Sequence, residues 1–294
     1  MRVTQGMLTA NFIRHLSNSN ARFSKLQEQL YTQRKITRPS DDPVIALKGM
    51  AYRTNLTEVE QYRRNLIEMY KWMENSEAGL EQANQIFQRA RELVVQASNL
   101  GTYNHEDLQK IKAEIAQLKE ALADVANTQV AGKYIFNGTN VDVRPVTIDN
   151  DGNFIFNNGS YEAFKIEVSK GVSIAASVNP VATFGQDVFR TFDELIAALE
   201  NDPTNIDSFI TRIQKHIDDM LAERAELGAR YNRIELIEDR LSNQEVIAYT
   251  ILKDNEGIDM ERVITDLKMQ ETIHRAALAV GARIIQPSLI DFLR

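Results

Sequence analysis

Residues 59–97, VEQYRRNLIEMYKWMENSEAGLEQANQIFQRARELVVQA, decide the fold. An apolar side chain stands at every seventh position of this stretch, and a second line of mostly small or apolar residues follows each by three. The two lines are Val59, Leu66, Met73, Leu80, Phe87 and Val94, and Tyr62, Met69, Ser76, Ala83, Ala90 and Ala97. Six heptads of this kind are typical of a coiled coil. They predict one helix over about residues 44–100, which at 1.5 Å per residue is roughly 85 Å long.

A second long helix is predicted over about residues 206–256. Its apolar side chains repeat with the same period, at Ile213, Met220, Leu227, Ile234, Leu241 and Ala248. By the same rise per residue this helix is roughly 75 Å long, which is close to the first. Two helices of matching length, each with one apolar line, favour antiparallel packing against each other.

Each long helix is separated from a shorter heptad segment by residues that break helices. The first break comprises Arg38, Pro39, Ser40, Asp41, Asp42 and Pro43. Within it, Asp42 suits the N-cap of the next helix and Pro43 its first position. The second break is residues 254–259. The order short, long, long, short predicts a mainly α protein, an elongated antiparallel coiled-coil and helical-bundle rod with both termini at one end.

The two terminal segments carry more apolar side chains than they can bury against each other. About residues 8–35 have one narrow seam, which is Phe12, Leu16, Ser19, Phe23, Leu26 and Leu30. About residues 260–292 have a seam and a second stripe, which are Met260, Val263, Leu267, Ala277 and Ile284, and Ile264, Leu278, Ile285, Leu289 and Phe292. Because two stripes need two sets of neighbours, we expect an assembly interface with other subunits. Its predicted residues are Phe12, Leu16, Phe23, Leu26, Leu30, Ile264, Leu278, Ile285, Leu289 and Phe292.

The middle of the chain has a different pattern. A third helix is predicted through residues 108–125 and a short one at about 188–200. Between them, strand-like runs at residues 146–148, 154–156, 161–168 and 172–176 are separated by turn residues, which predicts one small inserted antiparallel β-meander. We therefore expect three domains. They are residues 1–43 with 258–294 (terminal coiled coil), residues 44–136 with 187–257 (long-helix bundle) and residues 137–186 (β-meander).

Composition excludes several classes of protein. The 294 residues have a net charge of −7, which argues against general nucleic-acid binding, although residues 1–50 carry eight Lys and Arg against three acids. There is no cysteine, so disulfides and cysteine-based metal sites are excluded. No apolar run approaches the roughly 18 residues of a membrane span, and the N-terminal segment lacks the apolar core of a cleavable signal peptide. We expect no membrane insertion, and either a cytoplasmic protein or export without a cleaved signal.

No catalytic constellation is recognisable, so an enzyme is not expected. His216 and Asp219 share one helical face and could hold a metal, but a solvated surface pair is the better interpretation. The run from Asp149 to Asn153 resembles a calcium loop, yet Ser160 stands where the closing Glu of such a loop belongs. Flanking strands favour a hairpin turn there. The prediction is no cofactor and no metal.

The whole chain resembles the flagellin superfamily. The break from Arg38 to Pro43 is similar to the Arg…Asp-Asp-Pro element that follows the first terminal helix in that superfamily. The C-terminal run from Gln286 to Leu293 is similar to its Gln…Ser-Leu-Leu-Leu ending. Within the superfamily, residues 127–139 (NTQVAGKYIFNGT) are similar to the Gly-x-Tyr-x-Phe-x-Gly-Thr run of the hook-associated protein 3 family.

This resemblance implies a structural role without enzyme activity, as the junction that joins the flagellar hook to its filament. The implied partners are hook-associated protein 1, flagellin, further copies of the chain in a ring, and a flagellar export chaperone. The implied location is the hook–filament junction of a secreted, bacterial-type flagellum, reached through type III export without a cleaved signal peptide. Three alternatives stay open: a flagellin, an enzyme or metal-binding protein that uses residues 145–176, and a cytoplasmic coiled-coil tether.

Overall fold

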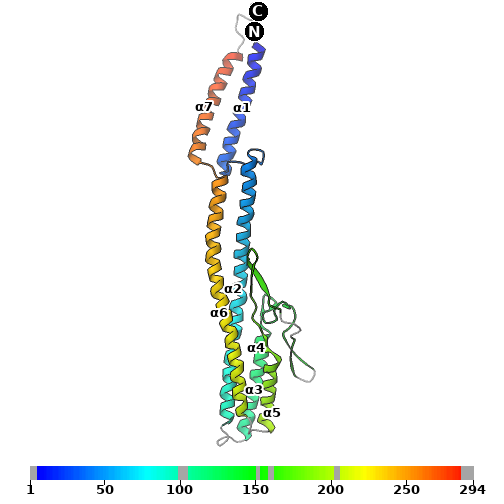
Figure 1. The fold of residues 1–294 in the computed structure, drawn as a ribbon. Helices are drawn as coiled ribbons and strands as arrows, with labels where there is room; N and C mark the ends of the chain where they lie inside the picture. The colour runs from blue at the N-terminus through cyan, green and yellow to red at the C-terminus, as the bar shows by residue number, and fades with distance from the viewer. Residues whose placement is uncertain (1–4, 99–104, 150–152, 158–161, 202–205, 286–294) are drawn as a thin grey trace, which may run out of the picture. The chain divides into compact units, whose positions relative to one another are not determined.

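The structure is a computed structural model that describes residues 5–98, 105–149, 153–157, 162–201 and 206–285. As predicted, the protein is mainly α, with small antiparallel strand pairs (Figure 1). The helices are α1 (Gln5–Thr32), α2 (Pro43–Ser98), α3 (His105–Ala126), α4 (Val181–Phe184), α5 (Gln186–Asn201), α6 (Asp207–Glu256) and α7 (Met260–Ile285). The strands are β1 (Gln129–Val130), β2 (Lys133–Tyr134), β3 (Val146–Ile148), β4 (Phe154–Phe156), β5 (Lys165–Ser169) and β6 (Val172–Ala175).

The chain divides into two compact units. Residues 1–58 and 244–294 form the terminal unit, and residues 59–243 form the central unit. α2 and α6 each run through both units. The β-hairpins share the hydrophobic core of the central unit, since Phe154, Phe156 and Val168 belong to the same buried cluster as Leu80 and Phe87. The finer division into three domains stays a prediction.

α2 begins where the sequence predicts. Asp42 Oδ1 accepts hydrogen bonds from the backbone N–H groups of Val44 at 2.9 Å and Ile45 at 3.1 Å, which is the geometry of an N-cap. Pro43 occupies the first helical position, where its missing N–H group has no partner to lose. The break after α1 is therefore also the start signal of α2.

The long helices pack antiparallel through their heptad lines in the central unit. Contacts advance along α2 as they retreat along α6: Tyr70 donates to Glu238 at 2.8 Å, Glu77 pairs with Arg224, and the Phe87 ring lies 6.3 Å from the His216 ring. All six α2 positions of the first heptad line are buried, and the buried α6 positions follow the predicted line: Ile213, Met220, Leu227, Ile234 and Leu241. The predicted antiparallel pairing is confirmed for this unit.

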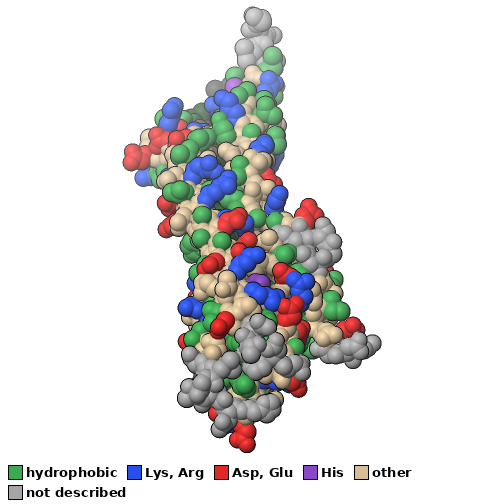
Figure 2. Space-filling view, turned by 60° about the horizontal axis from the view of Figure 1, so that its bottom comes forward, with side chains coloured by type: hydrophobic (Ala, Val, Ile, Leu, Met, Phe, Trp, Pro, Cys, Tyr) green, Lys and Arg blue, Asp and Glu red, His purple; other side chains and the backbone are tan. Residues whose placement is uncertain are grey.

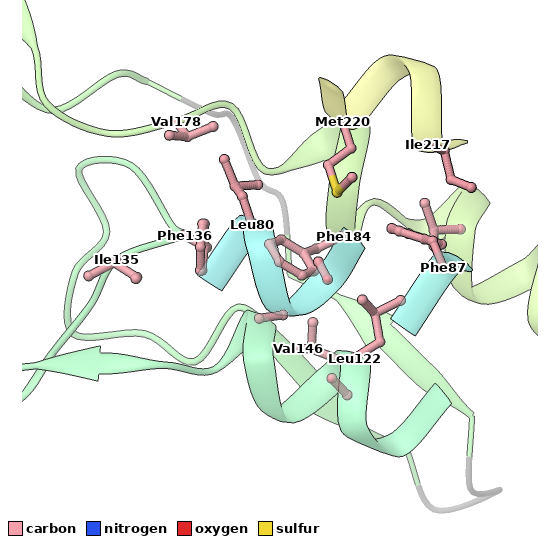
Figure 3. Packing of buried hydrophobic residues seen from close by; sticks show 14 of the residues in the cluster. Leu80, Phe87, Leu122, Ile135, Phe136, Val146, Val178, Phe184, Ile217 and Met220 are labelled. Atoms are coloured by element: carbon pink, nitrogen blue, oxygen red, sulfur yellow. The ribbon is translucent and has the colours of Figure 1, made fainter. Parts of the chain in front are cut away.

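Phenylalanines close the core between the long helices and the shorter elements. Phe136 and Phe184, whose ring centroids are 4.7 Å apart, meet Leu80 of α2 (Figure 3). Phe154 of β4 stacks on Phe189 of α5 at 5.6 Å. The hairpins are therefore held by aromatic side chains that insert among the helices. Each such side chain buries a large apolar area, although the strands are short.

The predicted single meander is wrong, because the strands form three separate two-stranded sheets: β1 with β2, β3 with β4, and β5 with β6. The free edge of β4 meets a side chain instead of another strand. Gln186 of α5 accepts from the N–H of Phe156 at 2.9 Å and donates to the carbonyl of Phe154 at 3.0 Å. One glutamine amide thus satisfies the backbone groups that a meander would have paired with β5.

The β1–β2 turn places Phe136 against α2 at a glycine. Ala131 and Gly132 both have positive φ, which suits a tight two-residue hairpin turn. Two residues after β2, the buried Phe136 ring lies over Gly79, where an added Cβ atom would come within 2.7 Å of the ring. A helix-interior glycine costs stability, so its presence here reflects this close approach.

Gly79→Ala is expected to lower the free energy of unfolding by about 1–3 kcal/mol, because overpacking outweighs the gain in helix propensity. Gly228 of α6 is the matched control, since an added Cβ there meets nothing within 4 Å. Gly228→Ala should raise stability by about 0.5–1 kcal/mol. Urea unfolding followed by circular dichroism measures both. A stabilising Gly79→Ala would contradict the close approach.

His216 is not the solvated surface residue predicted from the sequence. Its Nε2 lies 3.1 Å from the Thr191 hydroxyl, and its ring stacks beside Phe87 at the edge of the core. Burial lowers the pKa of His216 below its ordinary value of 6.5, and the nearby carboxylates of Asp187 and Asp219 only partly oppose this effect. The folded state therefore favours the neutral ring.

This shift predicts a pH-dependent stability. Because the unfolded chain binds the proton more readily than the folded one, the contribution of His216 is fully present above about pH 6.5 and is lost as the pH falls below it. His216→Gln keeps a donor for Thr191 but does not titrate, so it should lose less stability on acidification than the wild type. The check is urea unfolding at pH 7.5 and pH 5.5, with His15→Gln as the exposed control.

Candidate assembly interface

α1 and α7 form an antiparallel pair in the terminal unit (Figure 1). The seam predicted on α1 faces α7, and its residues are half-buried: Phe12, Leu16, Ser19, Phe23, Leu26 and Leu30. Phe23 stacks on His274 with ring centroids 6.4 Å apart, and Gln270 donates to the Ser19 hydroxyl at 2.9 Å. Near the other end, the tip of the Phe12 ring lies against the buried Gly281, where an added Cβ atom would come within 2.2 Å of it. Five of the ten predicted interface residues thus lie along a contact within the chain and keep part of their surface open.

The second stripe predicted on α7 is exposed as far as the structure describes it. Ile264 is 38% exposed and Leu278 48%, and Met260, which was predicted on the seam, lies instead on this side of α7 at 36%. Leu289 and Phe292 lie outside the described residues, and the side chain of Ile285 is not described either. The α1–α7 pair therefore leaves this face of α7 open to another partner.

A further exposed stripe on α7 was not predicted. Met269, Ile273 and Val280 are 56%, 50% and 53% exposed, and at 100° per residue they lie on the opposite flank of α7 from Ile264 and Leu278. The spacing of four and then seven residues is a sequence signal that could have found it. α7 thus carries three apolar lines: one against α1 and one on each side.

Exposed apolar side chains concentrate in the terminal unit. Of the 26 large hydrophobic residues that are exposed in the described chain, seven lie in residues 1–58 and ten in residues 244–294. Figure 2 shows such side chains open on the surface among charged ones. Besides α7 they include Val44, Leu47 and Met50 at the start of α2, and Val246, Ile247, Tyr249 and Ile251 at the end of α6. Exposure on this scale is typical of an interaction surface.

The predicted break has a defined internal structure. Asp41 accepts hydrogen bonds from the N–H groups of Thr37 at 3.3 Å and Arg38 at 3.2 Å, and its other oxygen binds the Lys25 ammonium at 3.0 Å. The Lys25 hydrogen bond, followed by that of the Arg38 backbone, lowers the pKa of Asp41. Arg38, Pro39 and Ser40 themselves are exposed. The break is therefore a turn tied back to α1.

Two connectors, the segment between α1 and α2 and the segment between α6 and α7, are bound to each other by hydrogen bonds. The N–H of Lys35 donates to the carbonyl of Glu256 at 2.7 Å, and Arg34 and Gly257 form an antiparallel bridge. The Glu256 carboxylate is almost fully buried, with the Arg53 guanidinium at 2.5 Å and that of Arg34 at 3.8 Å. It lies directly on Gly49, where any side chain would overlap it. Sequence patterns did not reveal this ionic cluster.

The described residues show little that points to other chemistry. No group of three or more metal-ligating side chains gathers in the part of the chain that the structure describes. No described helix is long and apolar enough to cross a membrane. At the loop that resembles a calcium site, the N–H of Asp149 donates to the carbonyl of Asn153 at 2.9 Å, which closes a hairpin between β3 and β4.

Two protein families match this chain. The bacterial flagellin N-terminal helical region matches residues 3–141, and the bacterial flagellin C-terminal helical region matches residues 210–293. Together the two matches cover α1, α2, α3 and α7, and α6 from residue 210 onward. The residues between them, 142–209, contain the β3–β4 and β5–β6 hairpins and the short helices α4 and α5.

Individual relatives match over nearly their full length. Flagellar hook-associated protein 3 of Escherichia coli K12 is 26% identical over 305 residues, 94% of this chain and 95% of the relative. A flagellin of Bacillus subtilis 168 is 28% identical, over 97% of each chain. The crystal structure of the flagellar junction protein FlgL from Legionella pneumophila superposes with a TM-score of 0.58 at 16% identity, over 71% of this chain and 99% of that one. The last comparison confirms the fold.

Proposed function

Because the chain belongs to the bacterial flagellin family, a family of structural proteins and not of enzymes, we propose that it is the adaptor that joins the flagellar hook to the filament. The observation that carries the proposal is the exposure of apolar stripes on both flanks of α7. A helix that is already paired with α1 and still presents two apolar stripes is built to be enclosed by neighbours.

The two flanks support a ring of copies. Leu278 on one flank and Ile273 on the other lie on different surfaces, so a neighbour on each side would use two different patches. Such head-to-tail contacts generate rings when the rotation between copies closes. A single C2 dimer would cover only one patch on each copy. The arrangement therefore favours repeated copies around an axis.

The junction role is favoured over that of the filament subunit by the middle of the chain. The run from Gly132 to Thr139 is similar to that of the hook-associated protein 3 family, and here it builds the β1–β2 turn that seats Phe136 on α2. Sequence identity alone does not separate the two roles, since it is 26% with the E. coli hook-associated protein and 28% with the B. subtilis flagellin. A filament subunit is thus the second candidate.

The proposed partners follow from this role. Hook-associated protein 1 would bind on the hook side and flagellin on the filament side, with copies of the chain between them. Before assembly, an export chaperone would cover the exposed flanks of α7, and the chain would leave the cell through the type III apparatus without a cleaved signal peptide. Its place would be the hook–filament junction.

The test is electron microscopy of a strain that lacks the gene, with flagellin assayed in the culture medium. Bare hooks with abundant flagellin in the medium are expected, because export continues while the filament has no seat. Bare hooks without released flagellin would indicate the filament subunit instead. Normal filaments would overturn both roles.

A further inference from the structure

A polar contact lies in the middle of the seam between α1 and α7. The Gln270 amide donates to the Ser19 hydroxyl at 2.9 Å and to the Ser19 carbonyl at 3.2 Å, and both side chains are half-buried. Ser19 is the polar member of an α1 seam whose other five residues are leucine or phenylalanine. Gln270 therefore gives this serine a partner that an apolar side chain could not provide.

The next turn of α7 adds a second polar residue to the seam. His274 stacks on Phe23 with ring centroids 6.4 Å apart, and its Nδ1 atom is buried without a hydrogen-bond partner among the described residues. Buried polar atoms without partners cost free energy, and apolar residues of similar volume often hold such a contact more firmly. The polar residues of this seam therefore contribute something other than the strength of the α1–α7 pair.

Apolar side chains alone would favour a different partner for α1. The α7 seam comprises Val263, Leu267, Gln270, His274, Ala277 and Gly281. Only the first two of these are large and apolar, whereas five of the six α1 seam residues are. Two α1 helices from different copies would bury more apolar surface against each other than α1 buries against α7. Some feature has to disfavour that pairing.

Ser19 is placed to disfavour it. In an antiparallel pair of α1 helices whose seams overlap fully, Ser19 of each copy would face Phe23 of the other. A phenylalanine ring has no amide or carbonyl group to bind the hydroxyl, so both serines would be buried without a partner across the seam. A single polar residue in a coiled-coil seam selects partner and register in this way, at a cost in stability.

Gly281 favours the same choice through its size. The tip of the Phe12 ring occupies the space beside Gly281 that a side chain would otherwise fill. In the antiparallel α1–α1 pair, Phe12 would instead face Leu30 of the second copy, which leaves no such space. α7 thus fits α1 at two positions, by an amide opposite Ser19 and by an open space opposite Phe12.

We propose that the Ser19–Gln270 contact determines which helix pairs with α1. Ser19 disfavours the α1 helix of another copy, and Gln270 makes α7 the helix that satisfies the serine. Both act as positioning residues, because they select the pair that carries the exposed flanks of α7. The inference goes beyond the junction role, since any subunit that brings several α1 helices close together faces the same choice.

The absence of cysteine allows a cross-linking test on the purified full chain. Asn20→Cys places one thiol on an exposed residue beside the seam, near the middle of α1, where two antiparallel α1 helices would bring their thiols together. Oxidation and non-reducing electrophoresis measure the rate at which linked dimers form. Adding Ser19→Leu should raise this rate at least tenfold. Adding Ser17→Leu, the same exchange at an exposed residue on the far face of α1, should change it less than twofold.

Gln270→Met distinguishes selection from simple weakening of the α1–α7 pair. It removes the amide from α7 and leaves Ser19 in α1, so α1–α1 pairing stays disfavoured and the rate should stay within twofold of that of Asn20→Cys alone. The proposal would be overturned by an unchanged rate in Ser19→Leu, or by an equal rise in Ser17→Leu. A rise in Gln270→Met as large as that in Ser19→Leu would also overturn it, because the contact would then only hold α1 and α7 together.

Discussion

Leu278→Asp and Ile273→Asp, one on each exposed flank of α7, are each expected to abolish filament growth while the isolated chain stays folded. The side chains are 48% and 50% exposed, so a charge at either position disturbs little within the chain. Surface substitutions of this kind change stability by about 0.5 kcal/mol or less. Enclosed by a neighbouring subunit, the same carboxylate would be buried without a partner, which costs several kcal/mol at each interface.

The measurement pairs swimming and electron microscopy with circular dichroism of the purified variants. Thr272→Asp is the matched control, because Thr272 is exposed on the face of α7 that points away from α1. It should fold equally well and retain filaments. Normal filaments with either Leu278→Asp or Ile273→Asp would show that the flank concerned is not an interface.

Glu256→Ala is expected to lower the free energy of opening the contact between the two connectors of the terminal unit by about 1–3 kcal/mol. Removal of one partner from a fully buried ion pair costs about 3–5 kcal/mol. The smaller figure applies because the side chains of Arg53 and Arg34 are 46% and 55% exposed, so water partly replaces the lost carboxylate. The backbone hydrogen bond from Lys35 to residue 256 stays possible, so the connectors should open more often without separating permanently.

Hydrogen exchange of the full chain measures this opening. The amide of Lys35 should exchange on the order of 10-fold faster in Glu256→Ala, which corresponds to about 1.4 kcal/mol. Glu58→Ala, at an exposed α2 position of the same unit, should leave that rate unchanged. Gly49→Leu should reproduce the effect by displacing the carboxylate sterically. Unchanged exchange in both Glu256→Ala and Gly49→Leu would contradict a fastening role.

Helix positions and pairing could be predicted because they repeat. The line from Val59 to Val94 has a period that only a long helix satisfies, and the structure buries every member of it. The start of α2 was predicted to the residue because Asp42 and Pro43 act locally through the backbone groups next to them. Local and periodic sequence signals can therefore be recognised without knowing which distant residues they contact.

Features that depend on one distant contact could not be predicted. Glu256 is a polar residue at the end of a helix, and its burial requires Arg53, Arg34 and the missing side chain of Gly49, all about 200 residues away in sequence. The separation of the hairpins has the same origin, since Gln186 takes the edge of β4 that the strand pattern assigned to a neighbouring strand. The exposed stripe of Met269, Ile273 and Val280 was not predicted for another reason: it has only three members, which is too few for a clear periodic pattern.

Because the first helix pairs with the last, α1 stays unpaired while most of the chain is still being synthesised. α1 ends at Thr32 and α7 begins 228 residues later at Met260, so during synthesis the seam of α1 has no partner until almost the whole protein exists. At about 5–20 residues per second this interval is roughly 10–45 s. Throughout it, Phe12, Leu16 and Phe23 are available to any other apolar surface. When many ribosomes translate one mRNA close together, the exposed α1 seams of neighbouring nascent chains can associate with each other. Translation with the ribosomes further apart should therefore raise the yield of chains that are not aggregated.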